Sequence, residues 1–390
     1  MNIKINSTDL EQALKVVHVT VGSSSDISSH YVFRSREGKL EVLSYDGRTF
    51  SSSFVSHTKV EDSPAFAGVE TPHQTDTVAP PFTVEARRIH VLLDNVGANQ
   101  PLDVSYNDGG EVTVQASRGK ITFSSLDPSL FPYWDDVLTG ATVTAKVAAD
   151  RLHAAFSNAR QFIYDQESKA PHLCVAEFRN GVLHSTDQMA VSLVKMPGME
   201  ACKLRVFVKD LPNLLSFLST AKGEEVEVLE SDRASFIRRP NGAVFGETVF
   251  AHRFPDINVD WELEDDQSWD LFQEELLAGI GFLQSGAKLD EPRVRFQRDG
   301  NTVNLSMTSV SGKPLPLTIP LVSFKQKEGG VNEMPTFSVT DAYLSKILNG
   351  NDNTKVSFGV SKKGAGGWIR VRDDRGTDTY LTTVAWLKSA

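Results

Sequence analysis

The chain has 390 residues and a net charge of −10, with 40% hydrophobic and 23% charged residues, which predicts a soluble globular protein of two or three domains. No apolar run is long enough to span a membrane, and two cysteines, Cys174 and Cys202, exclude a disulfide framework or a zinc cluster, so we expect a cytoplasmic protein without a metal or other cofactor. The acidic balance disfavours general nucleic-acid binding, but it allows a protein that keeps its basic residues on one inner surface.

The first third of the chain predicts three strands, two helices and a hairpin. The opening strand alternates apolar and polar residues, unlike a signal peptide, and the first helix has a cap followed by an i, i+3, i+4, i+7 apolar stripe. The expected elements are a strand over 1–6, a helix over 7–17, a hairpin over 31–33 and 39–46, a helix over 84–93, and strands over 102–105 and 121–123. Residues 61–81, rich in Pro, Thr, Ser and Ala, predict a long loop inside this third.

The second and third parts of the chain predict the same elements in the same order. In the second part they are a helix over 150–156, a hairpin over 175–178 and 182–187, a helix over 208–218 and a strand over 226–228. In the third part they are a helix over 268–277, a hairpin over 294–296 and 303–308, a helix over 339–348, and strands over 356–358 and 380–387. Glycine lies in each hairpin turn, where a positive φ is needed, and the glycines of 364–367 predict another hairpin turn.

The threefold order predicts three repeated α+β units, each with two helices on antiparallel sheets. Phe131-Pro132 and Phe254-Pro255 each leave a strand, because proline cannot continue a ladder of hydrogen bonds. We therefore expect domains over 1–138, 139–260 and 261–390.

This order of elements resembles the bacterial DNA polymerase III beta subunit, the DNA sliding clamp, over the whole chain. The family carries Thr-Asp-Gly-His-Arg-Leu-Ala where residues 186–192 are Thr-Asp-Gln-Met-Ala-Val-Ser, and its Phe-Pro-Asp matches residues 254–256. The Gly-His-Arg triplet is absent, and Val384 replaces a proline of the family's last strand. These departures indicate a divergent clamp with altered partner choice, encoded either by a phage or by a host.

The resemblance implies a closed ring, formed by a homodimer, that encircles duplex DNA and slides without sequence specificity. Helices would line the hole and attract phosphates weakly. Most acidic residues on the predicted helices fall in first turns, where carboxylates favour the dipole. The basic residues expected to face DNA are Lys15, Arg87, Arg88, Arg151, Arg160, Lys209, Lys222 and Lys346. Each of them is equally well explained as part of an ordinary solvated helix face.

The resemblance also implies a pocket between the second and third units that binds short peptides of the DNA polymerase and the clamp loader. Met189 suits a surface that accepts several ligands, and Trp386 is an expected apolar anchor. The pocket residues carried over by position are His172, Thr186, Gln188, Met189, Ala190, Val191, Pro255, Val259, Thr383, Val384, Ala385, Trp386 and Leu387. For Met189 and Val191 the alternative is a core position on an alternating strand.

Two other functions compete with this one. The carboxylates of 135–136, 264–266 and 373–374 could hold a metal or act as acid and base, but they lie beside predicted turns with no histidine at ligand spacing, so we expect no enzyme. The second alternative is a non-catalytic oligomeric structural or interaction protein with clamp-like modules and no role on DNA.

Overall fold

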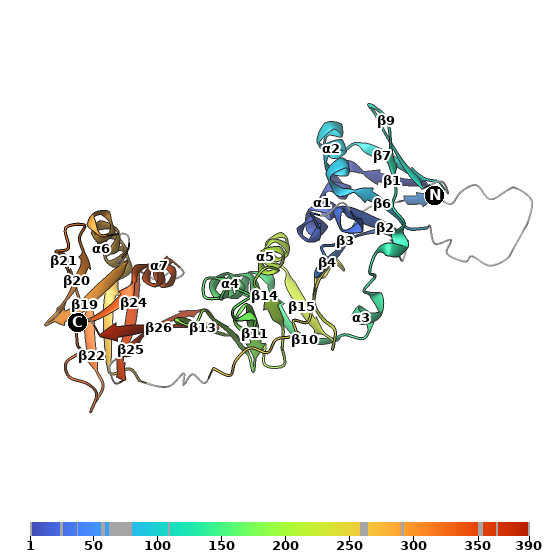
Figure 1. Ribbon diagram of the computed structural model, residues 1–390. Coiled ribbons are helices and arrows are strands. Elements are labelled where there is room, and N and C mark those ends of the chain that lie inside the picture. Colours follow the sequence, from blue (N-terminus) through green and yellow to red (C-terminus); the bar gives the residue numbers. More distant parts are fainter. Residues whose placement is uncertain are drawn as a thin grey trace, which may run out of the picture. The chain divides into compact units, whose positions relative to one another are not determined.

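The computed structural model describes residues 2–23, 26–36, 38–55, 59–61, 80–107, 110–257, 264–288, 290, 292–349, 354–363 and 366–388 (Figure 1). It divides into two compact units, which are distinct from the three predicted repeats. The first unit is formed by Met1–Ala154 with Cys202–Ala251, and the second unit by Ala155–Ala201 with His252–Ala390. Within the described residues, no helix is long and apolar enough to cross a membrane.

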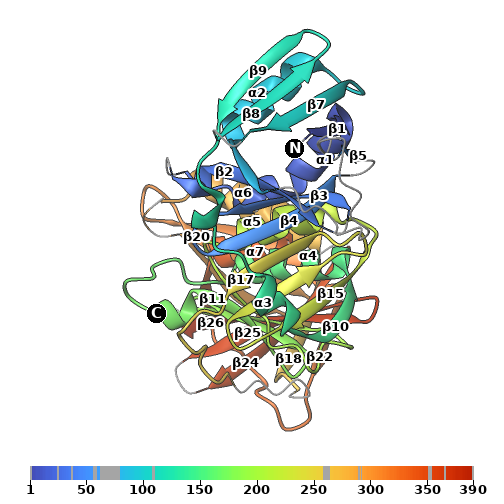
Figure 2. The same cartoon turned by 90° about the vertical axis from the view of Figure 1, so that its right-hand side faces the viewer.

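The first third contains two α-helices and two groups of antiparallel strands. Its elements are β1 (Asn2–Asn6), α1 (Ser7–Val17), η1 (His18–Thr20), η2 (Ile27–Ser29), β2 (His30–Arg36), β3 (Lys39–Tyr45), β4 (Thr49–Val55), β5 (Lys59–Glu61), β6 (Phe82–Glu85), α2 (Ala86–Val96), β7 (Pro101–Tyr106), β8 (Glu111–Ala116) and β9 (Gly119–Ser124). The Asn6 side chain caps α1 by accepting a hydrogen bond from Thr8 N at 2.9 Å. One sheet runs β5-β1-β7-β8-β9, and β7, β8 and β9 pass beside α2 (Figure 2).

The middle third joins the first through a shared sheet. Its elements are η3 (Pro128–Leu130), α3 (Asp135–Thr139), β10 (Thr142–Ala148), α4 (Ala149–Arg160), η4 (Pro171–Leu173), β11 (Val175–Arg179), β12 (Val182–Thr186), β13 (Ala190–Lys195), β14 (Arg205–Phe207), α5 (Leu211–Thr220), β15 (Glu225–Glu230), β16 (Ala234–Arg238) and β17 (Val244–Thr248). The sheet runs β10-β15-β16-β17-β4-β3-β2-β6. At the join Gly246 pairs with Phe50, and a Cβ at Gly246 would lie 2.0 Å from the Phe50 ring. Only glycine lets the two strands meet there.

The last third joins the middle third through a second shared sheet. Its elements are β18 (Gln267–Phe272), α6 (Gln273–Gly286), β19 (Arg293–Asp299), β20 (Thr302–Thr308), β21 (Pro314–Pro320), β22 (Ser323–Gln326), β23 (Phe337–Thr340), α7 (Asp341–Asn349), β24 (Lys355–Lys363), β25 (Gly366–Arg375) and β26 (Asp378–Lys388). Strand β13 pairs with β26, with Ala190 opposite Val384 and Leu193 opposite Leu381. Helix α6 packs closely on β21: a Cβ at Gly279 would lie only 2.7 Å from Leu317 Cδ2.

Most predicted elements are confirmed. The α1 bounds agree, α2, α4, α5 and α7 lie within a few residues of the predicted helices, and all three hairpins form. The first two turns carry Gly38 and Gly181 at positive φ, and the third carries Gly300 at φ 55°. Strands β24 and β25 also form the predicted hairpin, with Lys363 opposite Gly366. Of the predicted loop over 61–81, residues 62–79 lie outside the described part of the chain.

The helix predicted over 268–277 is wrong in its first half. Residues 267–272 form β18, in which Gln267, Trp269 and Leu271 are buried and the residues between them are half-buried. This period of two is the pattern of a strand, and the helix begins only at Gln273. Asp270, assigned above to a helix, instead accepts a hydrogen bond from the hydroxyls of Ser323 and Ser357.

Candidate functional site

Three helices of the first unit lie side by side. Helix α1 contacts α2 on one flank and α5 on the other, and η1 at its end also contacts α5 (Figure 1). The apolar stripe of α1 is buried, while Gln12, Lys15 and His18 form its exposed face. This helix layer, defined here as α1, α2 and α5, is where the basic residues predicted to face DNA should gather.

Several predicted basic residues do lie on the helices. Lys15 Nζ lies 2.8 Å from Glu11 Oε1, and Arg88 Nε lies 2.6 Å from Glu85 Oε2, so both are exposed ion pairs within a helix face. Such pairs contribute little to stability and leave both charges open to solvent. Arg87 is exposed on α2, Arg160 is exposed at the end of α4, and Arg151 is half-buried in the first turn of α4.

Three other predicted positions are placed differently. Lys209 and Lys222 flank α5 instead of lying on it, because the helix begins at Leu211 and ends at Thr220. Lys209 Nζ lies 5.7 Å from the centroid of the Phe207 ring. Lys346 is on α7 but half-buried, with Nζ 5.9 Å from the ring of Phe162 and 5.3 Å from that of Tyr343. These cation–π contacts draw the Lys346 ammonium towards its own core.

A pair of histidines on the helix layer was missed from the sequence. His18 Nδ1 and His90 Nε2 each lie 2.8 Å from the hydroxyl of Tyr31, whose side chain is buried. The two imidazole rings meet edge to face at 4.8 Å. Burial, followed by the neighbouring His18, lowers the pKa of His90. No short sequence motif predicts this triad, because its three members come from separate elements, η1, β2 and α2.

The predicted peptide pocket is divided between exposed and buried residues. Met189 is 50% exposed, and Gln188, Ala385 and His172 are exposed as well. Thr186, Ala190 and Val384 are buried, and Ala190 and Val384 belong to the core beneath the β13–β26 join, so they support the surface without lining it.

The β13–β26 join nevertheless brings much of the predicted set together. Val191 pairs with Thr383, and Ala385 N donates to Met189 O at 3.1 Å. Pro255 O accepts a hydrogen bond from Arg179 Nη1 of β11 at 3.3 Å, and His172 lies on η4. Val259 lies outside the described residues, and Trp386 and Leu387 are described as backbone of β26 only.

Residues 187–189 form a tight turn between β12, which ends at Thr186, and β13, which begins at Ala190. Gln188 takes φ 80°, the conformation that favours glycine, at the position of the glycine in the related motif. Asp187 Oδ1 accepts hydrogen bonds from the backbone N–H of Met189 and Ala190 at 3.1 and 2.9 Å. Its Oδ2 accepts one from the Tyr343 hydroxyl of α7 at 2.9 Å, and burial and this bond raise the pKa of Tyr343. The turn is therefore fixed to the third repeat.

Most of the carboxylates considered for catalysis are engaged in ion pairs or hydrogen bonds. Arg34 donates to both oxygens of Asp135, at 2.6 and 2.7 Å, and lowers the pKa of that carboxyl. Four further carboxylates accept bonds from Ser361, the backbone N–H of Lys362, Arg375 and Thr379; they are Asp265, Asp266, Asp373 and Asp374. The described part of the chain contains no cluster of three His, Cys, Asp or Glu side chains suited to a metal.

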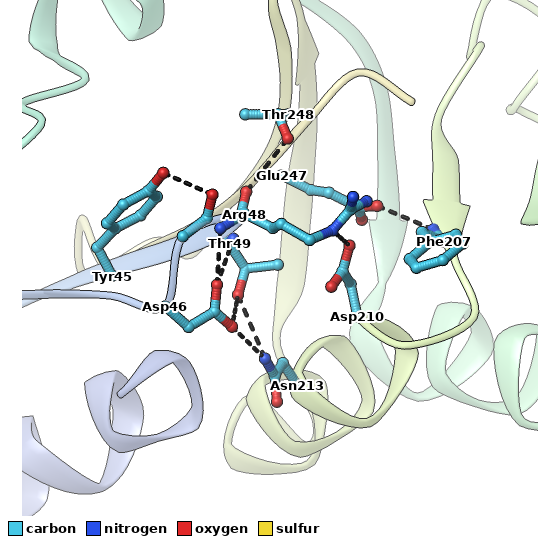
Figure 3. A network of polar contacts seen from close by, with 10 residues as sticks. Tyr45, Asp46, Arg48, Thr49, Phe207, Asp210, Asn213, Glu247 and Thr248 are labelled. Atoms are coloured by element: carbon cyan, nitrogen blue, oxygen red, sulfur yellow. Dashed lines mark hydrogen bonds and ion pairs between the residues drawn. The ribbon is translucent and has the colours of Figure 1, made fainter. Parts of the chain in front are cut away.

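A polar network holds the first third to the middle third beside the β4–β17 join (Figure 3). Arg48 Nε donates to Asp210 Oδ2 at 2.9 Å, and its guanidinium lies 4.4 Å from the centroid of the Phe207 ring. Glu247 is buried beside them and accepts a hydrogen bond from Phe207 N at 2.8 Å. Burial, followed by the neighbouring Asp210, raises the pKa of Glu247 well above its ordinary value.

Each unit also presents an open sheet edge with exposed apolar side chains. In the first unit β9 ends its sheet, and a cavity of about 790 Å³ lies between α2 and β8–β9, lined by the exposed Val91 and Ile121 among others. In the second unit β21 ends the main path of its sheet, and Phe282 on the adjacent α6 is 67% exposed. Open edges and exposed apolar side chains are features of surfaces that pair with another chain.

The whole chain is similar to solved structures of bacterial sliding clamps. The matches include the beta subunit of the DNA polymerase of Streptococcus pyogenes at 14% identity and TM-score 0.79, and the DNA polymerase sliding clamp of Bacillus subtilis at 12% and 0.77. Each match covers 100% of both chains. The chain has the sliding-clamp fold.

A third sliding-clamp structure, the DNA polymerase III beta subunit of Pseudomonas aeruginosa bound to griselimycin, matches at 15% identity and TM-score 0.79 over 100% of both chains. No family model matches the sequence, and no curated protein matches it. The likeness to sliding clamps is therefore one of fold, with identities of 12 to 15% in these three pairs.

Proposed function

We propose that this protein is a DNA sliding clamp, a non-catalytic processivity factor that closes as a head-to-tail homodimer around duplex DNA and works in the cytoplasm. The observation that carries the proposal is the full-length match to sliding clamps, which leaves no part of either chain unmatched. The threefold repeat of the sequence agrees with it, and we expect domains over 1–138, 139–260 and 261–390.

The two open edges support assembly of one copy with the next. Strand β9 and its groove carry Val91 and Ile121, while β21 and α6 carry Leu315 and Phe282. We expect β9 of one copy to pair with β21 of the other, which would complete both sheets and bury these apolar side chains. Ile121→Asp or Phe282→Asp should therefore give monomers in light scattering, whereas Leu130→Asp, on an exposed leucine of η3, should leave the dimer intact.

The helix layer supports weak attraction to phosphates. Lys15, Arg87 and Arg88 are exposed there, and Arg160 is exposed on α4. A ring needs only sequence-independent contacts to the backbone, because its retention on DNA is topological. Phosphate contacts by Arg151, Lys209, Lys222 and Lys346 belong to the same proposal.

Partner binding would use the exposed part of the β13–β26 join. Met189, Gln188 and Ala385 form a surface next to the buried Ala190 and Val384, and the griselimycin complex of the Pseudomonas protein supports a ligand site on the clamp fold. We expect peptides of the DNA polymerase and clamp loader to bind here. Met189→Ala should weaken partner binding without changing the dimer.

Retention on circular DNA tests the proposal. The protein is diluted until its dimers dissociate, mixed with nicked circular duplex at low salt, and concentrated so that rings can close around the DNA. The complexes are separated by gel filtration, and the circle is then cut once. A clamp stays on the circle and is lost after the cut. The triple variant Lys15→Glu, Arg88→Glu, Arg160→Glu should load poorly and remain dimeric, while Lys195→Glu, Lys203→Glu, Lys313→Glu, a change of equal charge outside the helices, should load normally. A dimer that never associates with circles would instead favour a structural protein with clamp-like modules.

A further inference from the structure

The histidine pair on the helix layer is built around one hydroxyl group. A tyrosine hydroxyl donates a single hydrogen bond, so with neutral rings one imidazole donates to Tyr31 and the other accepts from it. Both contacts measure 2.8 Å, and Tyr31 is fully buried, so its hydroxyl depends on these two partners. The ring that donates to Tyr31 still has its second nitrogen free of this bridge.

One proton can therefore be added without breaking either hydrogen bond. It enters the second nitrogen of the donating ring, while the accepting ring keeps its bond from the Tyr31 hydroxyl. A second proton would displace that hydroxyl and place two like charges in rings 4.8 Å apart. His18 is exposed, whereas His90 is half-buried and has a lowered pKa, which assigns the donating, proton-accepting role to His18.

The net charge of the surrounding helices determines how much one added proton changes the attraction of this surface for phosphates. Helix α1 carries Asp9, Glu11 and Lys15, and α2 carries Arg87, Arg88 and Asp94, so the charges within the two helices cancel. Glu85, which precedes α2 and pairs with Arg88, leaves a net charge of −1. His18 of η1 follows Lys15 of α1 by three residues, and His90 follows Arg87 on α2 by three residues, so each imidazole lies about one turn after a basic residue. One added proton would cancel this net negative charge, which otherwise repels phosphates.

We propose that the His18–Tyr31–His90 triad is a proton-controlled contact for a DNA phosphate on the helix layer. His18, held by the Tyr31 hydroxyl with His90 behind it, takes up the proton and donates a charge-assisted hydrogen bond to a phosphate oxygen. This inference rests on the proposed function, and it adds to it a dependence of DNA affinity on pH.

The charged groups near the two histidines are compatible with protonation of this triad. Glu11 and Asp94 act on His90 and favour its charged form, against burial and His18. Glu11 itself is paired with Lys15, and Glu41 on β3 is paired with Arg34 at 2.6 Å. Two further elements beside η1, α5 (Leu211–Thr220) and β4 (Thr49–Val55), carry no charged side chain.

The salt dependence of DNA binding tests the triad. Binding of a labelled duplex is measured by fluorescence anisotropy across a salt series at about pH 5.5 and about pH 8, on either side of an ordinary imidazole titration. One added phosphate contact should steepen the slope of log affinity against log salt by about 0.9 per chain at the lower pH. His18→Gln should abolish this difference, and His252→Gln, on an exposed histidine of the second unit, should preserve it.

Two outcomes would overturn the inference. Either the wild-type slope is the same at both pH values, or His18→Gln changes with pH as the wild type does. A wild type that binds duplex at neither pH would count against the clamp function and with it the triad.

Imidazole NMR gives a second readout on the wild type: addition of duplex should raise the titration midpoint of His18, and an unmoved midpoint contradicts the contact. Tyr31→Phe removes the bridge and should reduce the pH effect while the dimer persists.

Discussion

Replacing Glu247 by glutamine should stabilise the first unit at neutral pH. The Glu247 side chain is buried next to Asp210, and its Oε1 accepts a hydrogen bond from the backbone N–H of Phe207 at 2.8 Å (Figure 3). Its raised pKa means that the folded chain holds this group as a neutral acid at pH values where the unfolded chain has released the proton. Glutamine has the same shape, keeps the acceptor for Phe207, and remains neutral at every pH.

The magnitude follows from that single proton. The stability that Glu247 contributes is fully present below about pH 4.3, the pKa of an unfolded glutamate, and is lost as the pH rises towards the folded-state pKa. Across that window the folded state binds one more proton than the unfolded state, so the free energy of unfolding falls by about 1.4 kcal/mol per pH unit. The advantage of Glu247→Gln over the wild type should grow at this rate.

Hydrogen exchange of β14 and β17 measures the difference locally. At each pH the two proteins share the same intrinsic exchange rates, so the ratio of their protection factors gives the change in opening free energy. Peptides from α6, in the other unit, should exchange alike in both proteins. The matched substitution Glu41→Gln should act in the opposite direction, because this buried carboxylate is charged and bonded to Arg34, and the change should cost about 1.5–3 kcal/mol. Protection that changes with pH in parallel for Glu247→Gln and wild type would refute the reasoning.

Substitutions at three further sites, Gln188, Gly279 and Gly246, test backbone and packing features by urea unfolding. Gln188→Gly should stabilise the second unit by about 1 kcal/mol, since glycine adopts φ 80° without strain, while Gln188→Ala should bring no gain. On α6, Gly279→Ala should cost about 1–3 kcal/mol by clashing with β21, whereas Gly281→Ala, which meets open space, should be neutral or stabilising by up to about 1 kcal/mol. Gly246→Ala should cost at least about 3 kcal/mol by forcing the Phe50 ring from the β4–β17 join, and unchanged stability would contradict the close pairing of these two strands.

Local periodicity accounts for what the sequence predicted well. The apolar stripe of α1 and the hairpins with Gly38, Gly181 and Gly300 depend on neighbours within a few residues, and these elements form where expected. The same reasoning failed at residues 268–272, where Trp269, Leu271 and Phe272 were assigned to a helix, although the segment pairs with β22 and β24 as a strand. It also failed at Gln188, because a residue other than glycine gave no sign of a positive φ.

Contacts between distant segments account for what the sequence could not predict. The His18–Tyr31–His90 triad and the Arg48–Asp210 pair each join segments that no spacing rule connects. Candidate basic residues were read from helix patterns, so Lys209 and Lys222 were assigned to a helix that they only flank. Burial of Ala190 and Val384 likewise depends on the β13–β26 pairing, which forms across almost the entire second half of the chain.

Because neighbouring repeats share sheets, a single sequence repeat does not contain all the strands that complete its sheets. The middle repeat gives β17 to a sheet completed by β4, and β13 to a sheet completed by β26. A fragment cut at the predicted boundaries, 139–260, would therefore expose two strand edges with unpaired N–H and C=O groups, and it should aggregate or capture foreign strands. Exchanging single repeats between proteins of this fold would meet the same obstacle, whereas exchanging a repeat together with the strand that pairs with its edge would not.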